Sequence, residues 1–339
     1  MNMFFFIVAR QQADWIIGIK ENMNMFFFIV QHTMFFMIPL MIVALGGLFS
    51  EKSGIVNIAL EGKMIMGAFT GIFFITSFQD RLYGQPILIL ALLISILTGI
   101  FVSLFHAFAS ITLKANQTIT GIAINMFAPA FAVYIARLTG GTGNIHFSNQ
   151  FRIENVPFFG NIPLIGPMFF QNTYITTYIG FIILAVSAFV LYKTKFGLRL
   201  RACGEHPSAA DSLGVNVVKV RYLSVMISGA LAGLGGVVLI VPITTVFNGT
   251  VSGYGFLALA VLIFGGWNPL KILFAAFFFG LMQAFAASYA AIDFLRDLAI
   301  PAHFYRMAPY VATLIVLAFS SKKTTPPKAL GMPYDKGSR

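Results

Sequence analysis

The stretch KTKFGLRLRACGEHPSAADSLGVNVVKVRY, residues 193–222, decides how the rest of the chain is interpreted. It is the longest interior stretch that does not suit the inside of a bilayer, and strongly apolar segments flank it on both sides. It carries six basic residues against only Glu205 and Asp211. Because positive charge gathers in cytoplasmic loops, this basic loop (residues 193–222) is predicted to face the cytoplasm between two membrane spans.

The centre of the basic loop has the pattern of a short helix. Pro207 suits the first helical position, Ser208 to Leu213 are compatible with a helix, and Gly214 can adopt the left-handed conformation that ends one. Composition alone leaves two interpretations of this helix. It is either an ordinary connector that fixes the orientation of the protein, or a surface on which another protein docks.

Composition places the chain among polytopic membrane proteins. Of its 339 residues, 58% are hydrophobic and 10% are charged, which is too apolar for a single soluble core. The net charge of +11 does not indicate a nucleic-acid partner, because six of the 22 Lys and Arg residues lie in the basic loop and five more in the C-terminal tail, a clustering that reflects membrane topology. Cys203, the only cysteine, excludes an internal disulfide.

The predicted fold is an all-α bundle of about eight to ten transmembrane spans with interrupted helices, in a plasma (inner) membrane. Residues 1–33 form an amino-terminal extension and the start of the first span, 34–320 the transmembrane domain, and 321–339 a cytoplasmic tail. Counting from the basic loop places Lys114 inside and Asp80 and Arg81 outside. The expected spans are residues 26–49, 64–78, 86–113, 118–138, 173–192, 223–247, 270–291 and 307–320, whereas residues 252–266 are too short for a full span.

Polar residues within or beside the spans are the candidates for a solute pathway. Residues 50–63 carry four charges between two apolar runs, so they form either a solvated turn at the interface or a broken helix that lines a pathway. The uncharged polar stripe that begins at Asn116 either contacts solute or bonds neighbouring helices. The candidate pathway residues are Asn57, Glu61, Asn116, Gln117 and Asn125.

Two further patterns concern the architecture. The small-residue run 228–236, with Gly229, Gly233, Gly235 and Gly236, predicts a face on which helices pack closely. A shift of 199 residues aligns Ser53-Gly54 with Ser252-Gly253 and Gly67 with Gly266. Interrupted segments at corresponding positions of two halves are typical of transporters, but chance matches among small residues leave the duplication open.

No pattern in the sequence predicts catalysis or a metal site. The five histidines lack metal-ligand spacing, and no acid, base or nucleophile cluster supports a membrane-embedded enzyme. The phosphate-binding motif GxxxxGK[ST] is absent as well, so no cofactor is expected. If transport is driven by ATP, a separate subunit must supply the motor.

The run GLRLRACGEHPSAADSLGVNVVKVRY resembles the signature of the branched-chain amino acid, ribose and nucleoside permease family of ABC importers. Three other stretches resemble the nucleoside-type members: GGLFSEKSGIVNIALEGKMIMGAF (46–69), GYGFLALAVLIFGGWNPL (253–270) and PPKALGMPY (326–334). Lys63 departs from the family, which usually has an apolar residue there. The resemblance covers residues 34–339.

The resemblance implies a membrane subunit that pairs with a similar permease, a cytoplasmic ATPase and a solute-binding lipoprotein outside. It assigns ATPase coupling to a short helix of the basic loop, with the residues Gly204, Glu205, His206, Pro207, Ala210, Asp211 and Gly214. A nucleoside-like solute is expected, although riboflavin, a simple sugar or a branched-chain amino acid would also fit. The alternative is a carrier driven by an ion gradient, with Glu51 and Glu61 as its charged groups.

Overall fold

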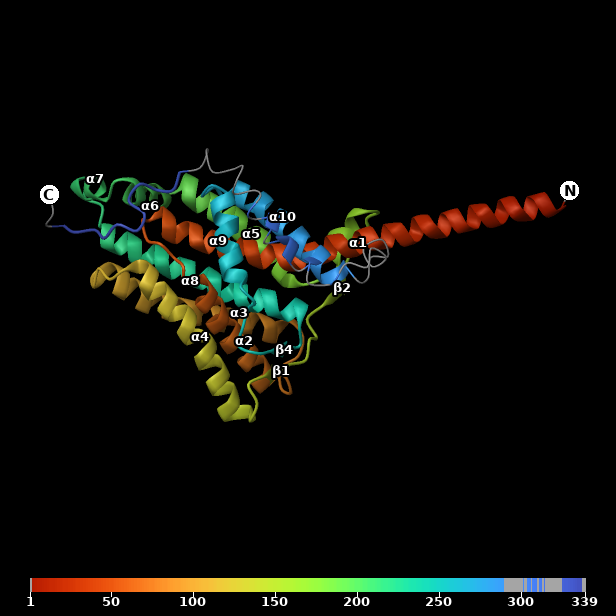
Figure 1. Cartoon of the computed structure of the whole chain (residues 1–339), viewed down its shortest axis with the longest axis horizontal. Helices are drawn as coiled ribbons and strands as arrows, with labels where there is room; N and C mark the ends of the chain where they lie inside the picture. Colours follow the sequence, from red (N-terminus) through yellow and green to blue (C-terminus); the bar gives the residue numbers. More distant parts are fainter. Residues whose placement is uncertain are drawn as a thin grey trace.

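The computed structural model describes residues 2–289, 301, 304–305, 307–309, 311–312, 314 and 325–336, with residues 2–22 described by their backbone alone. The described chain is mostly helical and has only four short strands, which confirms the all-α prediction (Figure 1). The helices are α1 (Asn2–Lys52), α2 (Leu60–Phe78), α3 (Gln85–Ala107), α4 (Gln117–Gly140), α5 (Ile175–Lys193), α6 (Lys195–Glu205), α7 (Pro207–Ser212), α8 (Val217–Ile243), α9 (Tyr254–Phe264) and α10 (Pro269–Ser288). Four short strands are β1 (Ile145–His146), β2 (Ile153–Asn155), β3 (Gln171–Thr173) and β4 (Val246–Phe247).

Six of the described helices are long and apolar enough to cross a membrane. They are the part of α1 from Met23, α3 with the π-helical turn that follows it, α4, α5, α8 and α10. The helix α2 has a comparable length but carries Glu61 and Lys63 in its first turn, and α9 is too short to span. The expected span 307–320 lies mostly outside the described residues. Helix α1 runs without a break through the predicted boundary at residue 33.

Helix α8 forms the centre of the bundle because its glycines admit neighbouring helices at backbone distance. A Cβ atom added to Gly229 or Gly233 would overlap backbone atoms of α3, and one added to Gly236 would overlap the backbone of α2. A Cβ on Gly235 would meet the side chain of Val43 in α1. The small-residue run therefore places α8 against three helices, as close backbone approach requires.

The two ends of the bundle have different structures. At one end lie α6, α7 and residues 325–336 (Figure 1). There, Nζ of Lys114 and Oδ2 of Asp335 form an ion pair at 2.8 Å. At the other end, β1 pairs with β4 and β2 pairs with β3, both antiparallel. We call these ends the basic face and the strand face.

Helices α1 and α8 run in opposite directions between these faces. Near the strand face, Gln31 of α1 donates to the carbonyl of Pro167. There too, Asn149 donates to the carbonyl of Val241 in α8. At the basic face, Arg221 at the start of α8 donates to the carbonyl of Ser53, directly after α1. Helix α1 is followed by an irregular segment and α2, and α8 is followed by an irregular segment and α9. Two such units that run in opposite directions resemble an inverted repeat.

The outer surface of the bundle is apolar, as a lipid environment requires. Leu97 and Phe101 of α3, Met126 of α4, Ile182 of α5 and Phe274 of α10 are all at least 60% exposed. The backbone donors of these helices are bonded internally, and Asn116, Asn216 and Asn268 cap the starts of α4, α8 and α10 with their side-chain oxygens. The chain is therefore a multi-pass membrane protein.

Candidate functional site

The basic loop folds into two helices, of which only the second was predicted. Pro207 begins α7 as expected, and Gly214 ends the turn after it with a φ of +80°. Glu205 and His206 lie exposed between α6 and α7, whereas Ala210 is buried. Helix α6 was not predicted; the apolar side chains of Leu200 and Cys203 are buried beneath this otherwise basic helix.

A tail segment, residues 325–336, lies directly beside this loop. The N–H of Ala329 donates to the carbonyl of Gly204 at 2.9 Å, and the N–H of Gly331 donates to the carbonyl of Gly54 at 3.0 Å. A Cβ atom on Gly204 would overlap the carbonyl of Lys52 and approach Pro327 to 3.3 Å. The tail segment thus joins the basic loop to the end of α1.

A shallow groove of about 350 Å³ lies between the tail segment and the start of α7. On the side of the basic loop it is lined by Glu205, His206, Pro207 and Ser208. Three of the seven predicted coupling residues therefore line one exposed groove. Of the others, Gly204 contacts the tail, Ala210 is buried, and Asp211 and Gly214 belong to α7 and the turn after it.

Arg221 holds the same junction from the inside. Its side chain is only 1% exposed, its Nε donates to the carbonyl of Ser53 at 3.1 Å, and its Nη1 donates to the carbonyl of Met332 at 3.2 Å. Gly54 (φ +95°) lies against the guanidinium, because a Cβ there would be 2.8 Å from Nη2. One buried cation therefore connects α8, the residue after α1 and the tail segment.

Residues 53–59, which we call the unwound segment, separate α1 from α2. The side-chain oxygen of Gln117 accepts from the N–H of Val56 at 2.7 Å. Asn125 accepts from the N–H of Gly62 at 2.8 Å and donates to the carbonyl of Ile58 at 2.9 Å. These two amides satisfy backbone groups that no regular helix would satisfy.

The remaining amides of the predicted pathway also make internal bonds. Asn116 caps α4 by accepting from the N–H groups of Thr118 and Ile119. Asn57 is fully buried, accepts from Nζ of Lys63 at 2.9 Å and donates to Oγ of Ser228 at 2.6 Å. The structure thus places all four amides where they hold the polypeptide in position.

Glu61 ties α2 to the start of α9. Its two carboxylate oxygens accept from the N–H groups of Gly253 at 2.9 Å and Gly255 at 2.6 Å. At the other end of α9, the carboxylate of Glu51 accepts from Nε1 of Trp267 at 2.6 Å. The interpretation of residues 50–63 as a solvated turn is wrong, since Glu51, Glu61 and Lys63 are buried and Glu51 and Glu61 are bonded to the following half of the chain.

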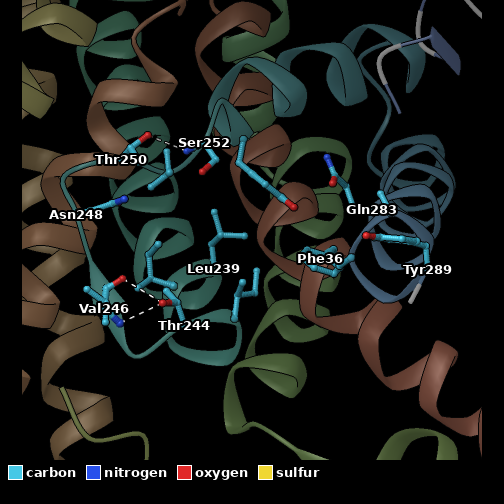
Figure 2. Close-up of a pocket in the computed structure, with 15 residues that line it drawn as sticks. Phe36, Leu239, Thr244, Val246, Asn248, Thr250, Ser252, Gln283 and Tyr289 are labelled. Carbon is cyan, nitrogen blue, oxygen red and sulfur yellow. Dashed lines mark hydrogen bonds between the residues drawn. The ribbon is translucent and has the colours of Figure 1, made fainter. Parts of the chain in front are cut away.

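A cavity of about 610 Å³ lies where the chain re-enters the bundle after α8. Figure 2 shows Asn248, Thr250 and Ser252 on one side of it and Phe36, Gln283 and Tyr289 on the other. Phe36 stacks on Tyr254 with ring centroids 6.2 Å apart and an interplanar angle of 26°. None of the residues that line the cavity in the described structure is Asp, Glu, Lys, Arg or His.

Sequence reasoning missed this cavity, because its residues come from three distant parts of the chain. The available signal was weak: Asn248, Thr250 and Ser252 form a polar stretch beside the segment judged too short to span, and Gln283 is an isolated amide in an apolar helix. Within the described structure, the side-chain amides of Asn248 and Gln283 make no hydrogen bond to protein. They are therefore available to a solute.

A sequence model of the family described as branched-chain amino acid transport system / permease component matches residues 29–318. The chain belongs to this permease family.

Two relatives are named as nucleoside permeases. The guanosine ABC transporter permease protein NupQ of Bacillus subtilis is 43% identical over 313 residues, which cover 92% of this chain and 97% of the relative. The nucleoside ABC transporter permease protein NupC of Lactococcus lactis is 38% identical, covering 91% and 96%. The putative glucose ABC transporter permease protein TsgC13 of Haloferax volcanii is 30% identical, covering 88% and 94%. No solved structure matches the chain.

Proposed function

We propose that this protein is the transmembrane permease subunit of an ABC importer that moves a nucleoside across the plasma membrane. The observation that carries the proposal is the full-length similarity to two permeases named for guanosine and nucleoside transport. The described cavity agrees with it, because aromatic rings and neutral amides suit a base and a sugar without charge. The protein acts as a conduit and not as an enzyme.

The proposal includes three partners. A cytoplasmic ATPase docks on the basic loop and supplies the energy. A second, homologous permease completes the membrane part, since NupC and NupB, two relatives from Lactococcus lactis, are both named nucleoside ABC transporter permease proteins. A lipoprotein delivers solute from outside. Because the proposed ATPase is cytoplasmic and docks on the basic loop, the proposal places the basic face and the C-terminus in the cytoplasm.

A continuous chain of contacts connects the proposed docking surface with the cavity. Gly204 at the end of α6 contacts the tail segment and Lys52, and Gly331 of the tail bonds Gly54. The unwound segment then leads to Glu61, which holds the N–H groups of Gly253 and Gly255 next to the cavity residue Ser252. Movement of α7 by an ATPase would reach the cavity wall along this path. The predicted pathway residues Asn57, Gln117 and Asn125 act in it by holding the unwound segment.

Uptake by the reconstituted protein tests the proposed function. Liposomes that contain the permease pair and its ATPase should accumulate radioactive guanosine only with ATP and the binding protein. The carboxylates of Glu51 and Glu61 already accept hydrogen bonds from N–H groups of the protein. This engagement disfavours a carrier in which they bind protons or sodium. Gradient-driven uptake by this chain alone would refute the ABC mechanism.

Reversing the charge of Glu205 and Asp211 should disconnect the ATPase from transport. In the Glu205→Lys/Asp211→Lys variant, two lysines enter the proposed docking surface, and like-charge contact with a partner costs several kcal/mol. We expect uptake to fall at least about tenfold while the protein still reaches the membrane. Asp80→Lys and Glu154→Lys change exposed acids on the strand face and should leave uptake unchanged. Normal uptake and ATPase co-purification in the double variant would contradict docking at α7.

The orientation of the basic face can be measured with a thiol reagent. Cys203 is a poor reporter, because burial hides its thiol and raises the pKa of that thiol. In a Cys203→Ser background, Ser208→Cys puts an exposed thiol in α7, and Asn144→Cys puts one on the strand face. A membrane-impermeant maleimide added to intact cells should label position 144 and not 208 until the cells are opened. The reverse pattern would place the basic face outside.

A further inference from the structure

We propose that the cavity between α1, α8, α10 and the loop 244–253 is the solute site of the permease, and that it accepts neutral nucleosides and rejects nucleotides. This inference rests on the proposed function and adds the residues of the site and the charge of the solute. None of the five predicted pathway residues lines this cavity, and all five bond protein groups.

The size and surface of the cavity suit a nucleoside. Its volume of about 610 Å³ lies within the range of roughly 300–1,000 Å³ usual for small-molecule sites. Phe36 and Tyr254 stack on each other in its wall, where they are 6% and 8% exposed, and Tyr289 adds a third aromatic ring to the lining. Aromatic side chains are the groups on which flat bases bind in single-stranded nucleic-acid sites. The apolar side chains of Leu239, Ile240 and Ile243 complete that part of the wall.

The polar groups of the cavity can recognise a base edge and a sugar. An amide side chain offers both a donor group and an acceptor oxygen, and the amides of Asn248 and Gln283 lie on opposite sides of the cavity (Figure 2). The side-chain oxygen of Thr250 accepts from the N–H of Ser252 at 3.0 Å, which fixes the loop that carries Asn248. The cavity therefore has two separated amides on supported backbone.

The electrostatics of the cavity disfavour a phosphate group. Helix α9 begins at the cavity wall, and the free N–H groups at a helix start usually attract anions. Here the carboxylate of Glu61 already accepts from Gly253 and Gly255, so that attraction is satisfied by the protein itself. No basic side chain lines the described cavity to replace it. Among the described residues that line the cavity, a nucleotide would find no counter-charge for the negative charge that it placed near Glu61.

Photolabelling tests the site directly and avoids the selectivity of the binding protein. The complex of permeases and ATPase in lipid nanodiscs is irradiated with radioactive 8-azidoguanosine, and labelled peptides are identified by mass spectrometry. Label should appear in residues 239–254 or 283–289 and should be blocked by guanosine but not by guanosine monophosphate at equal concentration. Label confined to other peptides, or equal protection by the nucleotide, would overturn the proposal.

Two leucine variants test the amides. In Gln283→Leu and Asn248→Leu, the guanosine concentration that gives half protection should rise about 3- to 10-fold, the effect of losing one neutral hydrogen bond. Asn144→Leu removes an exposed amide outside the cavity and should change nothing. Unchanged protection in both cavity variants would refute this site while leaving the importer function intact. Failure of the wild-type complex to import guanosine would instead refute the proposed function.

Discussion

Replacing Gly229 with leucine is expected to prevent the bundle from assembling. A single Cβ atom at this position would overlap Oγ of Ser103 and the backbone carbonyl of Gly99, and a backbone atom cannot move aside as the end of a side chain can. The cost should therefore exceed the roughly 1–3 kcal/mol typical of overpacked cores. We expect the yield of monodisperse protein in size-exclusion chromatography to fall at least about tenfold.

Gly140→Leu is the matched control for this substitution. Gly140 lies in the last turn of α4, and no atom lies within 4 Å of a Cβ atom placed there. Its variant should elute and unfold like the wild type. A Gly229→Leu protein with normal yield and thermal stability would show that α3 and α8 do not pack at backbone distance.

Replacing Arg221 with methionine is expected to release the tail segment. The change replaces the guanidinium with an apolar side chain and leaves the buried carbonyl of Ser53 without its donor, at about 1–3 kcal/mol, and it also removes the bond to the part-buried carbonyl of Met332. In the wild type, the bond from Ala329 to Gly204 holds the backbone around the exposed Lys328. In the variant, this part of the tail segment would detach from the bundle more often. Trypsin should then cut after Lys328 at least about tenfold faster than in the wild type.

Lys219→Met serves as the control, since Lys219 is exposed on the same helix two residues earlier. It removes a positive charge from the basic loop without touching the tail segment, and cleavage after Lys328 should keep its wild-type rate. Equal cleavage rates in Arg221→Met and the wild type would mean that the tail is held without Arg221.

The fold class was predictable because membrane spans are specified by length and composition. The predicted spans 26–49, 118–138 and 173–192 agree with the observed spans Met23–Lys52, Gln117–Gly140 and Ile175–Lys193 to within a few residues at each end. The close packing of α8 was also predictable, because it requires small residues that are clustered in one short stretch of sequence. What the pattern did not show was α6, because its basic surface resembles a connector when only local composition is considered.

The site was less predictable, because its polar residues serve different purposes that local sequence does not separate. Gln117 and Asn125 look like solute ligands, yet they bond Val56, Ile58 and Gly62, more than sixty positions away in the chain. Glu61 was flagged as a charged pathway residue, but its partners are the N–H groups of Gly253 and Gly255. Such pairings depend on tertiary approach, and no period or spacing within either segment encodes them.

The tail segment is synthesised after the groups that it binds. Residues 325–336 leave the ribosome after every described helix, so the carbonyls of Gly54 and Gly204 stay without their partners until this segment has been synthesised. Nη1 of Arg221 likewise lacks its acceptor until Met332 has been synthesised. A nascent chain that lacks residues 325–336 thus has an incomplete basic face, and the docking of the ATPase that we propose would have to follow the synthesis of this segment.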